Sequence, residues 1–168
     1  LRLARHGIEE RVKEINLAAV RVARAAAADS ERPVLVAGSV SPATPTNTRG
    51  EVAPAVLRDA FREQIEVLAE GGVDFILLET FGSLEELLEA IAVAREVAPS
   101  LPVVAQLTFV DDGRTLAGET PAEVGQRLDG LALAALGANC TLGPQGLLEV
   151  LRELGRHTTL PLTAQPNA

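Results

Sequence analysis

The sequence has no methionine, tryptophan or tyrosine, a single cysteine, and only 2% aromatic residues in 168 positions. One cysteine cannot form an internal disulfide, so a reducing cytoplasm is the expected compartment. No apolar run reaches the roughly 18 residues that a membrane span needs, and no signal-like segment opens the chain. We therefore expect a cytoplasmic protein that does not enter a membrane.

The chain also has few basic residues. The chain carries 15 Lys and Arg residues against 23 Asp and Glu residues, a formal net charge of -8, and its isoelectric point is near 4.8. An acidic surface repels phosphate, and the sequence has neither a GxGxxG motif after a strand nor a P-loop. These features argue against nucleic-acid binding and leave nucleotide binding without a motif.

Apolar residues, in contrast, make up 47% of the chain. This share argues against disorder, and the 14 Gly and 10 Pro residues argue against a coiled coil. The length suits one compact domain over residues 1–168. The chain begins at Leu1 without an initiator Met and stops at Ala168 directly behind a strand-like run, so we expect it to be an internal piece of a longer protein.

Segments with helical and strand periodicity alternate along the chain. Apolar residues at helical spacing, with capping signals and first-turn prolines, predict helices over Ile8 to about Ala28, from Pro54 to Gly71, after Ser83, from Pro121, and from Pro144 to Gly155. Short apolar runs predict strands over Val34–Gly38, Val73–Leu78 and Val103–Leu107, then one ending at Gly137–Cys140 and one over Pro161–Ala164.

Repeating units of roughly thirty residues, with strands buried on both faces, predict a parallel sheet in an α/β fold. Two architectures follow. An open doubly wound sheet suits the length, because five strands with their helices complete a small domain. A (β/α)8 barrel needs about 250 residues, so the chain would then cover only its middle strands and helices and lack the first and last ones.

Either architecture places its chemistry at the carboxyl ends of the strands. Polar residues stand at these ends: Ser39, Glu79 with Thr80, Gln106 with Thr108, Asn139 with Cys140, and Gln165 with Asn167. They would converge on one rim, although strand ends that reach solvent are also polar without having a function. The loop from Ser39 to Ala53 would either cover a substrate at this rim or be a plain surface connection.

Two of these residues carry the strongest chemistry. Cys140 is either an inert core thiol or a metal ligand, since nucleophilic catalysis needs a nearby histidine and His6 and His157 are both predicted away from this rim. A catalytic zinc takes three protein ligands, so partners of Cys140 would lie outside the chain. Glu79 could act as a general base, hold a substrate ammonium, or pair with a neighbouring arginine.

Four ordered motifs resemble the homocysteine S-methyltransferase family along essentially the whole chain. The strongest are Gly72-Val73-Asp74-Phe75-Ile76-Leu77-Leu78-Glu79-Thr80-Phe81 and Gly137-Ala138-Asn139-Cys140 with Gly143-Pro144, and the others are Val36-Ala37-Gly38-Ser39-Val40-Ser41-Pro42 and Gln165-Pro166-Asn167-Ala168. The sequence looks most like bacterial members that carry a methylenetetrahydrofolate reductase module after the methyltransferase barrel.

This resemblance implies a (β/α)8 barrel in which a zinc held by three cysteines activates the homocysteine thiol for methyl transfer, giving methionine. Cys140 matches the first ligand, and the other two belong to a Gly-Gly-Cys-Cys motif that would lie beyond residue 168. Glu79 matches the carboxylate that holds the homocysteine amino group, and Asn139 matches a residue beside the metal ligand that we place with the substrate-binding group. The resemblance leaves the methyl donor open, with a folate as one candidate.

Two other functions are consistent with the residues alone. One is a metal-independent barrel lyase or aldolase that uses Glu79 as its base, and the other is a non-catalytic barrel remnant that only binds a partner. A barrel piece that lacks its first and last strands would expose two sheet edges, so this stretch is expected to aggregate or pair edge to edge when expressed alone.

Overall fold

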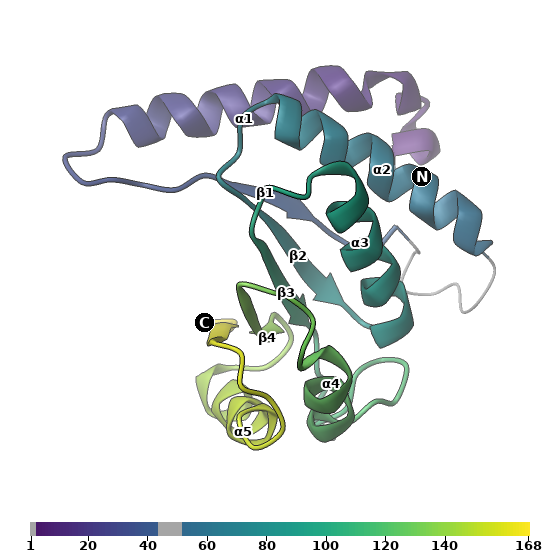
Figure 1. Cartoon of the computed structure of the whole chain (residues 1–168), viewed down its shortest axis with the longest axis vertical. Helices are drawn as coiled ribbons and strands as arrows, with labels where there is room; N and C mark the ends of the chain where they lie inside the picture. Colours follow the sequence, from purple (N-terminus) through teal and green to yellow (C-terminus); the bar gives the residue numbers. More distant parts are fainter. Residues whose placement is uncertain (1–2, 44–51) are drawn as a thin grey trace.

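The structure, a computed structural model, describes residues 3–43 and 52–168. Helices and strands alternate along the chain (Figure 1). The helices are η1 (Leu3–His6), η2 (Glu9–Arg11), α1 (Val12–Ala28), α2 (Pro54–Glu70), α3 (Leu84–Val97), α4 (Pro121–Leu128) and α5 (Pro144–Leu154). The strands are β1 (Ala37–Val40), β2 (Phe75–Phe81), β3 (Val103–Leu107), β4 (Ala135–Asn139) and β5 (Leu162–Gln165). The predicted loop between Ser39 and Ala53 includes residues 44–51, which lie outside the described residues.

The helices begin where their capping residues predict. Prolines occupy the first turns of α2, α4 and α5, where a missing backbone N–H costs no hydrogen bond. At the start of α4, the Glu123 backbone N–H donates to Thr120 Oγ1 at 3.2 Å and the Thr120 backbone N–H donates to the Glu123 carboxylate at 2.7 Å, which is a capping box. Ser83 caps α3 by accepting from the Glu86 backbone N–H. Among the described helices, none is both long and apolar enough to cross a membrane.

The five strands form one parallel sheet in the order β1-β2-β3-β4-β5. A doubly wound sheet requires a point at which the strand order reverses, and the described strands have none. The described strands therefore do not have the order of a doubly wound sheet. Sequential parallel order is the order of strands in a (β/α)8 barrel, and the described strands make a partial sheet of that kind.

Strand β1 begins later than the apolar run Val34–Gly38 predicts. Val34 and Leu35 are apolar but 48% and 70% exposed, and they precede β1 instead of belonging to it. The strand begins only where pairing with β2 begins, at Ala37 opposite Phe75. Just before it, the Val36 backbone N–H donates to the Asp74 carboxylate at 2.6 Å instead of to a strand. The partner strand thus decides where β1 starts, which an apolar run alone does not show.

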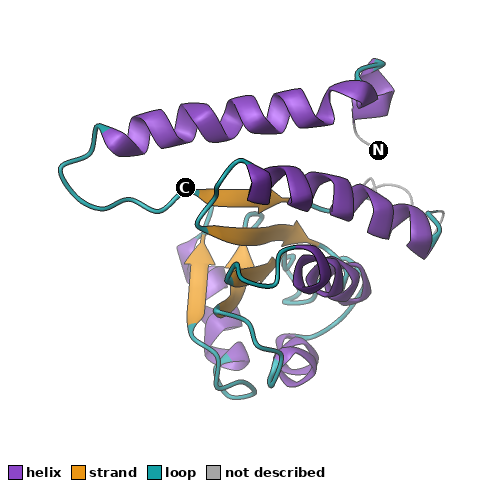
Figure 2. Cartoon of the chain, turned by 45° about the horizontal axis from the view of Figure 1, so that its top comes forward, coloured by secondary structure: helices purple, strands orange, loops and turns teal. Residues whose placement is uncertain are grey.

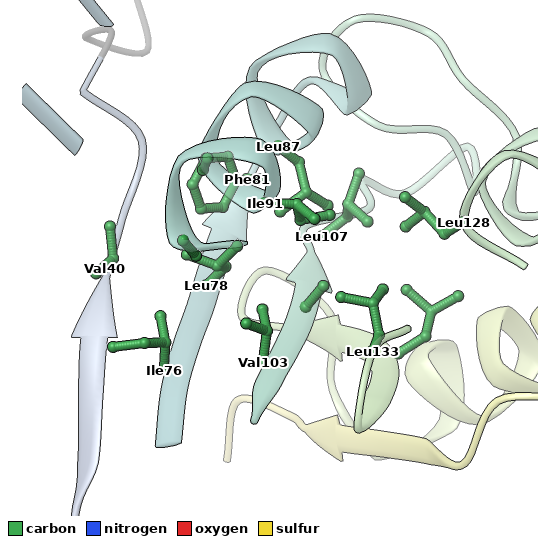
Figure 3. Close-up of a cluster of buried hydrophobic side chains, with 14 of the residues drawn as sticks. Val40, Ile76, Leu78, Phe81, Leu87, Ile91, Val103, Leu107, Leu128 and Leu133 are labelled. Atoms are coloured by element: carbon green, nitrogen blue, oxygen red, sulfur yellow. The ribbon is translucent and has the colours of Figure 1, made fainter. Parts of the chain in front are cut away.

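The hydrophobic core lies between the sheet and the helices that follow it (Figure 3). One buried cluster contains Ile76, Leu78 and Val103 of the strands together with Leu87 and Ile91 of α3. Helices α2 to α5 lie along one face of the sheet, and α1 packs against α2 (Figures 1 and 2). Successive side chains of a strand point to opposite faces of the sheet, so every second residue points away from the helices. Polar residues at the carboxyl ends of the strands form the rim described below.

Candidate active site

The carboxyl ends of β2 and β4 come together above the end of β3. Strand β2 ends at Glu79, Thr80 and Phe81 after an irregularity in its pairing with β3 between Leu78 and Phe81. Strand β4 ends at Asn139, and Cys140 follows directly. Strands two positions apart in a flat sheet are about 9.5 Å apart, so direct contact between their ends shows that the sheet curls toward this rim.

Glu79 is held from both sides. The hydroxyl of Ser39, on β1, donates to Glu79 Oε1, and Asn139 Nδ2, on β4, lies 3.5 Å from Glu79 Oε2. The carboxylate is only partly buried, so it remains accessible from the open side of the sheet. Both of these described neighbours donate hydrogen bonds without carrying a charge of their own. A carboxylate in this setting can accept hydrogen bonds from a cationic ligand.

Asn139 and Thr80 form a reciprocal pair. The Thr80 backbone N–H donates to Asn139 Oδ1 at 2.8 Å, and Asn139 Nδ2 donates to Thr80 Oγ1 at 2.8 Å. Asn139 is 1% exposed, and its backbone carbonyl accepts from Thr108 Oγ1 at 3.1 Å. The ends of β2, β3 and β4 are therefore linked by side chains as well as by the sheet itself.

Cys140 lies at the edge of this network. Its sulfur is 3.4 Å from Asn139 Nδ2 and 3.8 Å from Thr80 Oγ1, and the residue is half-buried. Its backbone N–H donates to the Gln165 carbonyl at 3.0 Å, which anchors it to β5. The backbone of Cys140 and Thr141 is left-handed, with φ of 60° and 58°. This turn carries the thiol off the strand and onto the rim, as the sequence predicted.

Comparison with known proteins fits this geometry. A sequence model of homocysteine S-methyltransferase matches residues 1–168, the whole chain. The chain belongs to the homocysteine S-methyltransferase family. The resemblance inferred from the strand-end motifs is thereby confirmed.

Two methyltransferase relatives show how far the similarity extends. The methionine synthase of Mycobacterium tuberculosis is 31% identical over 173 aligned residues, which include 99% of this chain and 14% of that protein. The homocysteine methyltransferase MmuM from Escherichia coli in its metallated form superimposes with a TM-score of 0.84 at 26% identity, over 99% of this chain and 62% of MmuM. The chain thus spans less than two thirds of the length of these two family members.

The metal expected for this family can be tested against the donor atoms present. A catalytic zinc takes three protein ligands. Within residues 3–43 and 52–168, no group of three or more His, Cys, Asp or Glu side chains is arranged to hold a metal ion. Cys140 can offer one sulfur at the rim, so the described residues could supply one ligand of a zinc site and not a complete set.

The remaining rim residues make three kinds of contact. Ser39 contacts Glu79, and Thr108 contacts Asn139, so both join the site. Gln106 lies deeper, 1% exposed, with Nε2 3.4 Å from Thr163 Oγ1. Gln165 and Asn167 contribute backbone contacts to the turn after Cys140.

The two histidines do not reach this network. His157, after α5, contacts Gln126 and Glu153, and His6 lies in η1.

Sequence reasoning placed Thr80 at the rim but missed its importance. Thr80 adopts a left-handed conformation, with φ of 65°, and it supplies two of the hydrogen bonds that join β2 to β4. No residue pattern marks this conformation, because threonine is uncommon at positive φ. The unusual backbone is visible only once the strands are paired.

Proposed function

We propose that this chain is the homocysteine-binding part of a methyltransferase that transfers a methyl group to the sulfur of homocysteine and gives methionine. One observation carries the proposal. Glu79 and Cys140 both contact the amide of Asn139 at one rim of the sheet, in a chain whose whole length matches the homocysteine S-methyltransferase family. A carboxylate and a thiol that contact the same amide suit the two ends of one small amino acid that carries both an ammonium and a thiol group.

Glu79 is the proposed anchor for the homocysteine ammonium. Its carboxylate is partly open to solvent and has no cationic partner among its contacts, Ser39 and Asn139. Pairing with a neighbouring arginine was the alternative, and no described ion pair involves Glu79. A fixed ammonium would orient the rest of the substrate so that its sulfur points toward Cys140.

Cys140 is the proposed first ligand of a zinc ion, with two further cysteines supplied from outside residues 1–168. When bound, zinc would supply the positive charge that converts the homocysteine thiol to the nucleophilic thiolate. The support is the position of the Cys140 sulfur at the rim beside Asn139, and the metallated form of MmuM among the structures that the chain resembles.

We further propose that these strands belong to a (β/α)8 barrel. The sequential strand order supports this, as does the coverage of 62% of MmuM. Strands supplied from outside this chain would close the sheet against the free edges of β1 and β5. Three features stay predictions from the sequence: the cytoplasmic location, a small-molecule methyl donor with a folate as one candidate, and a neighbouring reductase module.

The proposal can be tested on the full-length protein. Zinc content and homocysteine binding are measured first, by metal analysis and calorimetric titration, and methionine formation is then followed with candidate donors such as methylfolate and S-methylmethionine. We expect about one zinc per protein and loss of methyl transfer after exhaustive chelation. A zinc-free protein that neither binds homocysteine nor methylates it would contradict the proposal, and methionine formation that survives chelation would show that the transfer does not need the metal.

A further inference from the structure

The conformation of Thr80 is costly for its residue type. A β-branched residue at a φ of 65° is a genuine outlier, because its side chain crowds the backbone. Glycine would adopt this conformation without strain and would still offer a backbone N–H to Asn139 Oδ1. The hydrogen bond from the Thr80 backbone therefore does not explain why a threonine is here. What glycine could not supply is the hydroxyl.

The Thr80 hydroxyl contacts two residues of the opposite strand end. Its Oγ1 accepts from Asn139 Nδ2 at 2.8 Å and lies 3.8 Å from Cys140 Sγ. Asn139 is 1% exposed, and both atoms of its amide group are already engaged by Thr80. An amide nitrogen has only two hydrogens, so the short bond to Thr80 fixes how the same nitrogen faces Glu79 Oε2 at 3.5 Å and Cys140 Sγ at 3.4 Å.

We propose that Thr80 and Asn139 form a clamp that sets the position of the Glu79 carboxylate relative to the Cys140 sulfur. In this role Asn139 is a positioning residue that acts through Thr80 and Glu79, instead of a group that contacts homocysteine directly. Thr80 is a second positioning residue, and its hydroxyl orients the Asn139 amide. The inference rests on the proposed function, because it assigns the clamp to the spacing between the ammonium anchor and the metal-binding sulfur.

Replacing Thr80 separates this role from a purely structural one. Thr80→Gly removes the hydroxyl and the strain together, while Thr80→Ser keeps a hydroxyl. In the full-length protein we expect Thr80→Gly to keep or raise the melting temperature while its homocysteine affinity falls about tenfold, the usual effect of losing one hydrogen bond in an organised network. Thr80→Ser should bind homocysteine within about twofold of the wild type by the same reasoning.

Thr141 provides a matched control. It also has a left-handed backbone, with φ of 58°, but its side chain is exposed. Thr141→Gly should relieve the same type of strain and raise the melting temperature, which measures how much of the stability change in Thr80→Gly comes from strain alone. Zinc content is measured for every variant, since the clamp is expected to affect where Glu79 lies and leave the metal bound.

Each outcome supports or contradicts either the clamp or the proposed function. Loss of affinity in Thr80→Gly at an unchanged or higher melting temperature, with recovery in Thr80→Ser, supports the clamp. Wild-type affinity in Thr80→Gly overturns the clamp and leaves the proposed function standing. A lower melting temperature in Thr80→Gly also overturns it, because the side chain would then be present for stability. A wild-type protein that does not bind homocysteine refutes the proposed function itself.

Discussion

Gly137 of β4 lies directly against Thr163 of β5, so closely that a Cβ atom at Gly137 would come within 1.9 Å of the Thr163 carbonyl oxygen. Gln106 on β3 is in register with Gly137, and its Nε2 lies 3.4 Å from Thr163 Oγ1. The absence of a side chain at Gly137 thus permits both the pairing of β5 and a contact across β4.

Gly137→Ala is expected to disrupt the join between β4 and β5. The overlap is with backbone, which cannot rotate away as a flexible side chain could, so β5 must shift. We expect the free energy of unfolding to fall by about 3 kcal/mol, the upper end of the usual cost of overpacking, in urea denaturation of the full-length protein. Gly143→Ala is the control, because a Cβ at Gly143 meets nothing within 4 Å. Equal stability of the two variants would contradict the close approach.

Glu79→Gln tests the ammonium anchor. The change keeps the shape of the side chain and removes its charge, and a hydrogen bond to a charged group contributes roughly 1.5–3 kcal/mol. Homocysteine affinity measured by calorimetry should therefore fall by about one to two powers of ten, with zinc content unchanged. Glu66→Gln, at an exposed position of α2, is the control and should bind as the wild type does. Unaltered affinity in Glu79→Gln would remove Glu79 from the binding site.

Cys140→Ser tests the metal ligand with almost no change in size. A hydroxyl is a much poorer zinc ligand than a thiolate, so zinc should fall from about one per protein to nearly none, and methyl transfer should be lost as a consequence. Metal analysis after dialysis measures this directly. Retention of zinc in Cys140→Ser would show that the sulfur is not a ligand. Loss of zinc in Cys140→Ser and loss of homocysteine affinity without loss of zinc in Glu79→Gln would distinguish the metal ligand from the substrate anchor.

Asp74 should make stability depend on pH in the acid range. The Arg24 guanidinium, 2.8 Å away, holds the pKa of the Asp74 carboxyl below its usual value, and the Val36 backbone N–H adds to this. Because the pKa is lower in the folded protein, the contact stabilises the fold at pH values above the unfolded pKa, about 3.9, and this stabilisation is lost as pH falls through the folded pKa.

We therefore expect Asp74→Asn to lower the melting temperature at pH 7, and the difference from the wild type to shrink as the pH is lowered below about 4. Thermal unfolding from pH 7 to pH 2.5 measures it. Asp111→Asn, at an exposed carboxylate, is the control and should show no such trend. A difference that stayed constant down to pH 2.5 would mean that the charge of Asp74 is not what stabilises the fold.

The sequence predicted most of the helices and strands, and their order. First-turn prolines, the capping residues Ser83 and Thr120, and the short apolar runs are local signals, and local signals decide where helices begin and where buried strands occur. It was less successful with β1, because Val34 and Leu35 look like strand residues but have no partner strand. The sequence also does not predict whether the strands are arranged in sequential order or in the order of a doubly wound sheet, because both folds have the same alternation of helices and strands.

For the candidate site, the residue pattern alone predicts which chemical groups stand at the strand ends. Glu79 and Cys140 follow apolar runs, and parallel strands bring their carboxyl ends to one edge. The contacts between these groups depend on how the strands pack in the folded chain. The curl of the sheet brings β2 and β4 into contact, Thr80 takes a left-handed backbone, and the Asn139 amide lies between the carboxylate and the sulfur. Such contacts depend on residues about 60 positions apart, and no local propensity encodes that distance.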